Sequence, residues 1–302
     1  MKDIVLIHGT WCDGSVWGEF ATELEKLGLR VHTPSLRYHD LPYKEVEEKV
    51  AKVSLNDYVE DIVELVESLD EPPIVLGHSL GGLIAQLVGV KTKVEGLILM
   101  GTAPAAGIFA FYPSMIVCFY KHFLRWGFWK KSMPPYKHAF CDYCMNNQDP
   151  EDKEREFAKL VPESGFTYFQ MALPFLDKQK GAYVDFDKIK EPVLVITGTD
   201  DKMVNPNIAK ATAKKYKNSK LEIIQGSDHM YEAPKFRDVT VSVINKWLEE
   251  NNLLKEEIVL SVSEEIKTGN KIIQELHTEN KIIKAENTLL KAQIAELETV
   301  QA

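Results

Sequence analysis

The sequence predicts an α/β fold, a doubly wound and mostly parallel sheet with helices on both faces. Short runs rich in Val, Ile and Leu alternate with longer helical patterns along the first 250 residues. The first, third and fifth runs are apolar on both faces, as strands buried inside a parallel sheet are. Glycine-containing motifs with reactive side chains follow several of these runs. In open α/β sheets, ligands bind at the carboxyl ends of the strands.

The strands and helices can be assigned in chain order. We expect strands at Ile4–Ile7, Arg30–Thr33, Pro73–Leu76, Gly96–Met100, Val193–Thr197 and Leu221–Ile224. Helical spacing of apolar residues predicts helices at Val16–Leu27, Ser54–Leu69, Leu80–Val88, Asn205–Lys215 and Phe236–Glu250. Right-handed crossovers between the strands then leave few topologies.

The alternation stops between about residues 104 and 190, a stretch that is aromatic-rich and mostly helical in pattern. A structureless loop of that length is uncommon inside a compact domain. We therefore expect a helical lid insertion over one end of the sheet. The domains are then residues 1–250, which include the insertion, and a helical tail over residues 251–302.

The tail carries apolar residues at heptad spacing and asparagines at two core positions of the same repeat. The apolar residues are Ile266, Ile273, Leu276, Ile283, Leu290, Ile294 and Leu297, and the asparagines are Asn280 and Asn287. A buried Asn favours two parallel strands in register. We expect a homo-oligomer, a parallel dimer, through residues 266–298. An amphipathic helix packed on its own domain, a frayed tail, three strands and a partner protein stay open.

Composition narrows the class of protein. The 302 residues carry a formal net charge of −9, which gives no general attraction to nucleic acid or anionic lipid. The most apolar later stretch, Ile108–Phe119, is interrupted by Pro113 and is shorter than the roughly 20 residues of a membrane span. The four cysteines form no disulfide framework. We expect a cytoplasmic protein with reduced thiols and no stable membrane insertion.

Ser79 is the candidate nucleophile. It stands at the centre of Gly77-His78-Ser79-Leu80-Gly81, between a predicted strand and a predicted helix. A serine on such a tight turn needs glycines two residues before and after it. The helix N-terminus behind it favours an anion. The alternative is a glycine-rich turn with an ordinary serine.

Three further motifs supply the partners that a nucleophilic serine requires. His229 follows the last strand in Gly226-Ser227-Asp228-His229, and the acid is Asp200 or Asp201 after the preceding strand. The chain order of serine, then acid, then histidine is typical of catalytic triads in which the serine lies on a nucleophile elbow. The N–H groups of Thr10 and Leu80 are the candidate oxyanion donors. His8 is expected to stabilise its loop by hydrogen bonds.

Two other groups of residues have more than one interpretation. The apolar segment Phe109–Trp129 either lines a substrate pocket or forms the core of the lid. His138, Cys141 and Cys144 are spaced three apart, but no fourth ligand is evident. We therefore expect no metal and no cofactor, and the role of these three residues stays open.

These motifs resemble the α/β-hydrolase superfamily, in particular its compact esterase and lipase-like branch, over about the first 250 residues. The resemblance implies the α/β-hydrolase fold, a serine esterase and no cofactor, and its register implies Asp201 as the acid. Ser79 stands where epoxide hydrolases and haloalkane dehalogenases of this fold carry Asp. Gly9 and Met230 differ from the residues at the matching positions of plant hydroxynitrile lyases.

The leading hypothesis is a serine hydrolase that cleaves a carboxylic ester, thioester or lactone through an acyl-enzyme on Ser79. Its partner is a small-molecule ester with an apolar acyl part. A second hypothesis keeps the triad for acyl transfer to another acceptor, for a perhydrolase reaction or for a lyase reaction. A third is a non-catalytic scaffold protein oligomerised by its tail.

Overall fold

The computed structural model describes residues 1–254 and Lys271. The chain divides into two compact units, Met1–Leu253 and Leu254–Ala302. Apart from Lys271, the predicted coiled coil through residues 266–298 lies outside the described residues, so its dimer stays a prediction. No helix in the described part of the chain is long and apolar enough to cross a membrane.

The first unit is built on a six-stranded sheet in the order β2-β1-β3-β4-β7-β8, in which every neighbouring pair is parallel. The parallel sheet confirms the predicted α/β class. All six predicted strands are present, with bounds close to those expected: β1 (Lys2–Ile7), β2 (Leu29–His32), β3 (Ile74–His78), β4 (Gly96–Met100), β7 (Val193–Gly198) and β8 (Ser219–Ile224).

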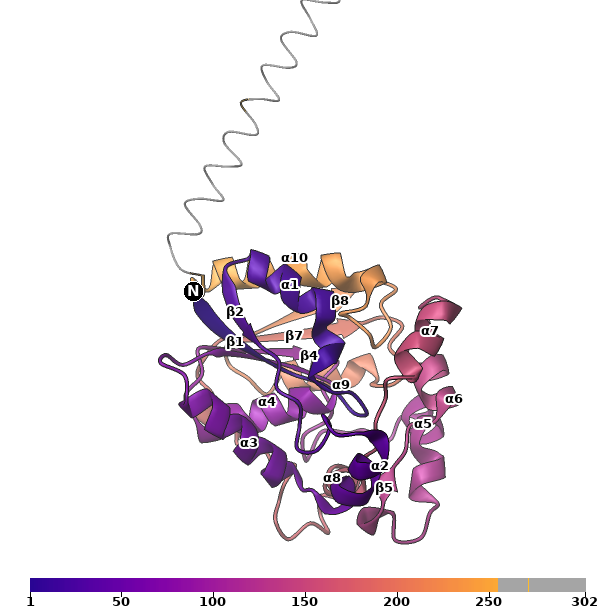
Figure 1. Cartoon of the computed structure of the whole chain (residues 1–302). Coiled ribbons are helices and arrows are strands. Elements are labelled where there is room, and N and C mark those ends of the chain that lie inside the picture. The colour runs from indigo at the N-terminus through magenta and orange to yellow at the C-terminus, as the bar shows by residue number, and fades with distance from the viewer. Residues whose placement is uncertain (255–270, 272–302) are drawn as a thin grey trace, which may run out of the picture. The chain divides into compact units, whose positions relative to one another are not determined.

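Helices cover both faces of the sheet (Figure 1). On one face lie α1 (Gly18–Lys26) and α10 (Pro234–Glu250), and on the other lie α3 (Leu55–Glu67), α4 (Leu80–Lys91) and α9 (Pro206–Ala213). Side chains alternate along each strand, so Val5 and Ile7 join the core beneath α3 and α4. Every residue of α4 from Leu80 to Val88 is buried, which explains why this helix is apolar all round.

Local signals set the starts of two of these helices. A capping box begins α3: the Ser54 hydroxyl accepts from the Asp57 N–H, and the Asp57 carboxylate accepts from the Ser54 N–H. The Asn205 side chain caps α9, and Pro206 occupies its first turn, where a missing N–H costs nothing.

The insertion (residues 104–190) departs from the mostly helical pattern expected. It contains α5 (Pro113–Phe123), α6 (Lys137–Ala139), α7 (Pro150–Phe157) and α8 (Gly165–Ala172), with a π-helical turn at Phe140–Cys144. It also contains an antiparallel pair, β5 (Ser132–Met133) with β6 (Glu163–Ser164). The sequence does not predict this pair, because two-residue strands are too short to show a periodicity of two. Outside the insertion, α2 (Tyr43–Lys49) is likewise an addition to the predicted helices.

A buried polar cluster ties the insertion to the main domain. Glu163 of β6 accepts a hydrogen bond from the Tyr58 hydroxyl of α3 at 2.7 Å and contacts His39 Nε2 at 3.3 Å. Burial alone would raise the pKa of Glu163, but the charge and hydrogen bonds of His39, with the Tyr58 bond, lower it overall. The pKa of His39 is raised in turn, because the Glu163 carboxylate outweighs the cost of burial. The two side chains are therefore held as an ion pair.

Candidate active site

Ser79 lies between β3 and α4 in a strained backbone conformation, with φ 54° and ψ −118°. This is uncommon for a residue with a side chain and clusters at functional sites. The turn is closed so tightly that a Cβ on Gly77 would lie 2.1 Å from the Gly81 carbonyl oxygen. A Cβ on Gly81 would lie 2.1 Å from the Ile7 carbonyl oxygen. Glycine is therefore required at both positions.

A hydrogen-bond chain connects the loops that follow β7 and β8. His229 Nδ1 donates to Asp201 Oδ2 at 2.7 Å. The same carboxylate oxygen accepts from the Tyr231 hydroxyl at 2.7 Å, and Asp201 Oδ1 accepts from the Val204 N–H at 2.8 Å. Asp201 is thus held in one orientation by three donors. The side chains of Asp201, His229 and Tyr231 are buried.

The imidazole of His229 is oriented for proton transfer. Because Nδ1 carries the proton of the hydrogen bond to Asp201, Nε2 of the neutral imidazole carries the lone pair. Among the described residues, Nε2 has no hydrogen-bond partner although it is buried. His229 lines the same small cavity as Ser79, Gly9 and Thr10. Burial lowers the pKa of His229, but the charge and hydrogen bond of Asp201 outweigh it and raise the pKa overall.

Asp200, the alternative acid, points elsewhere. It is exposed and accepts hydrogen bonds from the side chains of Asn147 and Thr199, which lower its pKa. The sequence alone left Asp200 and Asp201 open. In this structure the carboxylate next to His229 belongs to Asp201.

The two candidate oxyanion donors lie beside Ser79. Leu80 is the first residue of α4, so its N–H has no acceptor within the helix. Thr10 follows β1 and lines the same cavity as Ser79 and Leu80. Its hydroxyl is hydrogen-bonded to the Tyr168 hydroxyl of α8 at 2.8 Å. His8 donates from Nδ1 to the Gly9 carbonyl and accepts the Leu36 N–H at Nε2, which braces this loop.

A cavity of about 430 Å³ opens from Ser79 into the insertion. Apolar side chains dominate its wall, and many come from the predicted segment Phe109–Trp129: Phe109, Phe111, Met115, Ile116, Phe119 and Phe123. Tyr168, Met171 and Phe175 complete the wall from α8 and the loop after it. Trp129 does not line the cavity and packs on Phe169 instead. Each of the two interpretations of the segment therefore applies to part of it.

Two titratable groups behind His229 were not singled out from the sequence. The His78 ring packs at a tilt against the His229 ring, with centroids 4.6 Å apart, and its Nε2 donates to the His229 carbonyl at 2.8 Å. Glu232 is buried, with Oε1 3.7 Å from His78 Nδ1. Neither carboxylate oxygen accepts a hydrogen bond from another described residue. Burial therefore raises the pKa of Glu232 to about 7.

The His138, Cys141 and Cys144 group lies in the insertion, around the π-helical turn. Both thiols are free and buried, and burial raises the pKa of each. Within the described residues, no group of three or more His, Cys, Asp or Glu side chains is placed to hold a metal ion. The Cys144 carbonyl instead accepts the His229 N–H at 3.1 Å, so this turn supports the His229 loop.

The family can be assigned from a match over most of the chain. The model of the α/β hydrolase family matches residues 4–236. This chain belongs to that family. The matched residues include the Ser79 turn, the insertion (residues 104–190) and all of the sheet except its first two residues.

The curated relatives of this chain are distant, and the matches to them are partial. A carbendazim hydrolyzing esterase from Nocardioides is 30% identical over 103 residues, covering 33% of this chain and 41% of that protein. Salicylic acid-binding protein 2 from Nicotiana tabacum is 37% identical over 84 residues, covering 27% of this chain and 31% of that protein. The matches thus span less than half the length of these relatives.

Solved structures resemble this chain over most of its length. A monoacylglycerol lipase from Paleococcus ferrophilus aligns with a TM-score of 0.59 at 20% identity, covering 82% of this chain and 94% of that one. A methylesterase from Arabidopsis aligns with a TM-score of 0.61 at 14% identity, covering 82% and 98%. At these identities the likeness establishes the fold alone.

Proposed function

We propose that this protein is a serine hydrolase that cleaves carboxylic esters of apolar acids through an acyl-enzyme on Ser79. One observation carries the proposal. His229 Nδ1 donates a hydrogen bond to Asp201, and Nε2, which has no partner among the described residues, lies in the cavity that His229 shares with Ser79. A buried imidazole with one nitrogen committed to a carboxylate and the other unpartnered is arranged to accept a proton.

The chemistry follows from these positions. Ser79 Oγ attacks the ester carbonyl carbon while His229 Nε2 takes the hydroxyl proton. The Asp201 carboxylate stabilises the imidazolium that forms. The N–H groups of Thr10 and Leu80 donate to the oxyanion of the tetrahedral intermediate. His229 then protonates the departing alcohol. In the second half of the reaction His229 takes a proton from water, which attacks the acyl-enzyme and releases the free acid and Ser79.

The cavity supports an apolar acyl group. Its wall is mainly aliphatic and aromatic, and its volume of about 430 Å³ is within the range of small-molecule sites. Thioesters and lactones present the same carbonyl chemistry to Ser79. The partial matches to a carbendazim hydrolyzing esterase and to a pyrethroid hydrolase favour hydrolysis as the reaction class.

Two rival functions use the same residues. An acyltransferase, perhydrolase or lyase would keep the triad and change the acceptor or the bond broken. A scaffold protein would keep the fold without turnover. We retain both as outcomes of the test, because the predicted tail is unusual for the family.

The test is labelling with a fluorophosphonate probe, followed by mass spectrometry of the labelled peptide. We expect stoichiometric labelling of Ser79 in the wild type and none in Ser79→Ala. The exposed serine variant Ser15→Ala is the matched control and should label like the wild type. Absence of labelling in a folded wild-type protein would contradict the proposal and favour the scaffold function.

Turnover then separates hydrolysis from its enzymatic rivals. A series of esters and thioesters of increasing acyl length should show rising kcat/KM until the cavity is filled. The assay is repeated with an added alcohol acceptor or hydrogen peroxide. Acyl transfer to the added acceptor that dominates over release of free acid would reassign the reaction.

A further inference from the structure

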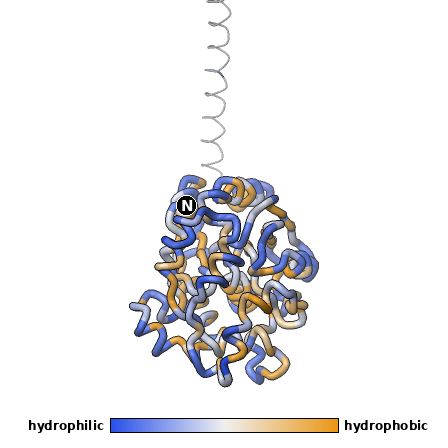
Figure 2. The backbone as a smooth tube through the Cα atoms, turned by 90° about the vertical axis from the view of Figure 1, so that its right-hand side faces the viewer, coloured by the Kyte–Doolittle hydropathy of each residue, from blue (hydrophilic) through white to orange (hydrophobic). Residues whose placement is uncertain are grey.

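Exposed apolar side chains and several basic residues occur in the segments that build the wall of the cavity at Ser79. Exposed apolar side chains gather there, and several are more than half exposed: Phe109 (63%), Phe111 (63%), Leu124 (78%), Trp126 (87%), Phe175 (78%) and Leu176 (56%). Phe109, Phe111 and Phe175 also line the cavity itself. Figure 2, in which the insertion faces the viewer, shows hydrophobic stretches of the chain on this side. Contiguous exposed apolar surface of this kind marks an interaction site.

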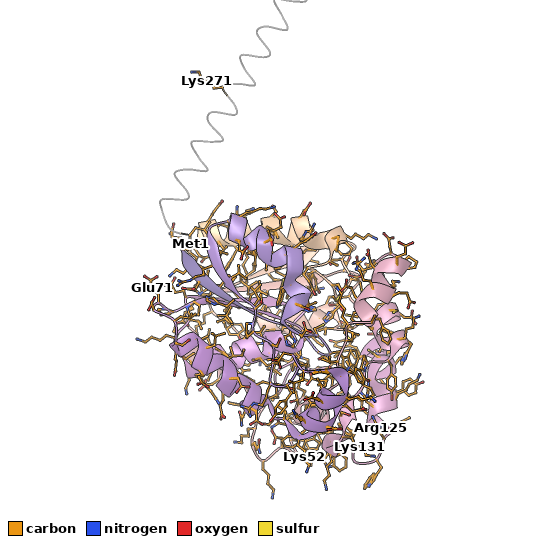
Figure 3. The ribbon with its side chains drawn as sticks, viewed as in Figure 1. Met1, Lys52, Glu71, Arg125, Lys131 and Lys271 are labelled. Carbon is orange, nitrogen blue, oxygen red and sulfur yellow. The ribbon has the colours of Figure 1, made fainter. Side chains whose placement is uncertain are left out.

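The segment that carries most of these side chains contains basic residues and no acidic residue. From Gly96 to Cys141 the chain contains no Asp or Glu, although the whole chain has a net charge of −9. Lys121, Lys130 and Lys131 are exposed, and Arg125 is half-buried. Within the described residues none of these four forms an ion pair. Figure 3 shows Arg125 and Lys131 at the same end of the molecule as Lys52.

Hydrogen bonds and ring contacts hold the cations beside the aromatic side chains. Lys131 Nζ donates to the Trp126 carbonyl at 2.9 Å, and Arg125 Nη1 donates to the Ser132 carbonyl at 3.2 Å. Trp126 packs edge-on against Trp129, with ring centroids 5.9 Å apart. Lys121 lies over the Tyr136 ring at 5.4 Å. We call this set of exposed apolar and basic residues the aromatic–basic face.

We propose that the aromatic–basic face docks on an anionic lipid surface. Trp, Phe and Leu that enter the headgroup region, flanked by Lys and Arg, are the composition of interfacial membrane segments. The uncompensated cations complement anionic headgroups, and each contributes near the membrane surface. The negative net charge of the whole chain hides this local excess of cations. Docking needs no membrane-spanning helix.

The position of the cavity favours lipid over a protein as the occupant. Phe109, Phe111 and Phe175 belong both to the wall of the cavity and to the aromatic–basic face. A folded protein covering that face would seal the cavity, and Ser79 would lose access to substrate. A fluid lipid surface instead presents acyl chains to the mouth. The choice of lipid over protein rests on the proposed function, whereas the docking face itself is argued from the surface residues.

The experiment measures binding of the full chain to vesicles by sedimentation. The Ser79→Ala variant is used so that lipid hydrolysis cannot alter the vesicles. We expect binding to phosphatidylcholine vesicles that contain phosphatidylglycerol, and binding at least about tenfold weaker to phosphatidylcholine alone. Raising the ionic strength from about 0.1 to about 1 M shortens the Debye length from about 10 to about 3 Å. The higher ionic strength should therefore weaken binding to the anionic vesicles, again by at least about tenfold.

Matched variants test whether this face carries the binding. Charge reversal of Lys121, Lys130 and Lys131 to Glu should weaken binding at least about tenfold. The control reverses three exposed lysines at the opposite, amino-terminal edge of the sheet, Lys91, Lys93 and Lys214. The control makes the same change in net charge and should bind like the parent.

The apolar contribution is tested in the same way. Leu124→Ser with Trp126→Ser should weaken binding, whereas exposed Ile223→Ser with Val239→Ser should not. Fluorescence gives a second readout, because Trp11, Trp17 and Trp247 are buried, Trp129 is half-buried and Trp126 is exposed. Vesicles should shift the emission of the parent to shorter wavelength, and the shift should be smaller in the Trp126→Ser variant.

Three outcomes would overturn the proposal. The first is no binding to either vesicle. The second is vesicle binding that the substitutions in the aromatic–basic face leave unchanged, which would assign the binding to another part of the chain. The third is concentration-dependent self-association that Trp126→Ser abolishes, without vesicle binding, which would assign the face to a second copy. Loss of probe labelling at Ser79 would refute the proposed function and leave this result untouched.

Discussion

The buried Glu232 makes stability depend on pH, and Glu232→Gln should remove that dependence. Burial raises the pKa of this carboxyl from the ordinary 4.5 to about 7. Between these two values the folded protein holds a proton that the unfolded chain has released. Folding therefore takes up a proton in this window, and the free energy of unfolding falls as the pH rises. Above pH 7 the buried carboxylate is ionised, without a hydrogen bond from another described residue.

The size of the effect follows from the shift. One pKa unit corresponds to about 1.4 kcal/mol, so the rise from 4.5 to about 7 amounts to roughly 3 kcal/mol. Glu232→Gln cannot ionise and resembles the protonated acid in shape and polarity. We expect the variant to match the wild type near pH 5 and to be more stable by about 3 kcal/mol near pH 8. For a unit of this size that raises Tm by roughly 6–12 °C.

Urea denaturation of both proteins from about pH 5 to about pH 8 measures this difference. His229 and Asp228 also have raised pKa values, so the wild-type profile alone is ambiguous, and the difference between the two proteins isolates Glu232. Glu60→Gln removes an exposed carboxyl and should change stability by less than about 0.5 kcal/mol throughout. Equal pH profiles for Glu232→Gln and the wild type would refute the reasoning.

Activity supplies a second readout of the same substitution. The Glu232 carboxylate contributes to the raised pKa of His229. Its loss should therefore move the acid limb of kcat/KM to lower pH. A purely structural role would change stability and leave the limb in place.

Three further substitutions test the geometry around Ser79. Asp201→Asn should lower kcat on a short-chain ester about 10⁴-fold, because the amide no longer holds the His229 tautomer. Asp200→Asn, which alters an exposed neighbour, should retain activity. A larger loss of activity in Asp200→Asn than in Asp201→Asn would reassign the acid. Tyr231→Phe removes a hydrogen bond to a buried carboxylate, so a urea titration should show a loss of about 1.5–3 kcal/mol. Gly81→Ala forces a Cβ against the Ile7 carbonyl and should cost about 3 kcal/mol or more by the same measurement; a loss below about 1 kcal/mol would contradict the tight turn.

Much of the fold could be predicted because its signals are local. Buried parallel strands are continuous apolar runs, and all six lie close to their predicted bounds. The break in the alternation of strands and helices predicts the insertion, whereas β5 and β6 could not be predicted, since two residues carry no pattern. The coiled coil of residues 266–298 stays a prediction.

The sequence predicts that Ser79 and His229 lie at the same edge of the sheet, because motifs that follow parallel strands meet there. It did not decide between Asp200 and Asp201, since adjacent side chains point in different directions that only the folded loop defines. Nor did it indicate the contact of Tyr168 with Thr10, which joins residues 158 positions apart. The burial of Glu232 without a hydrogen bond from another described residue, and the exposed aromatic side chains at the cavity, are likewise products of packing. These properties depend on burial and on contacts between segments that are distant in the sequence, and the spacing of residues along the chain does not predict either.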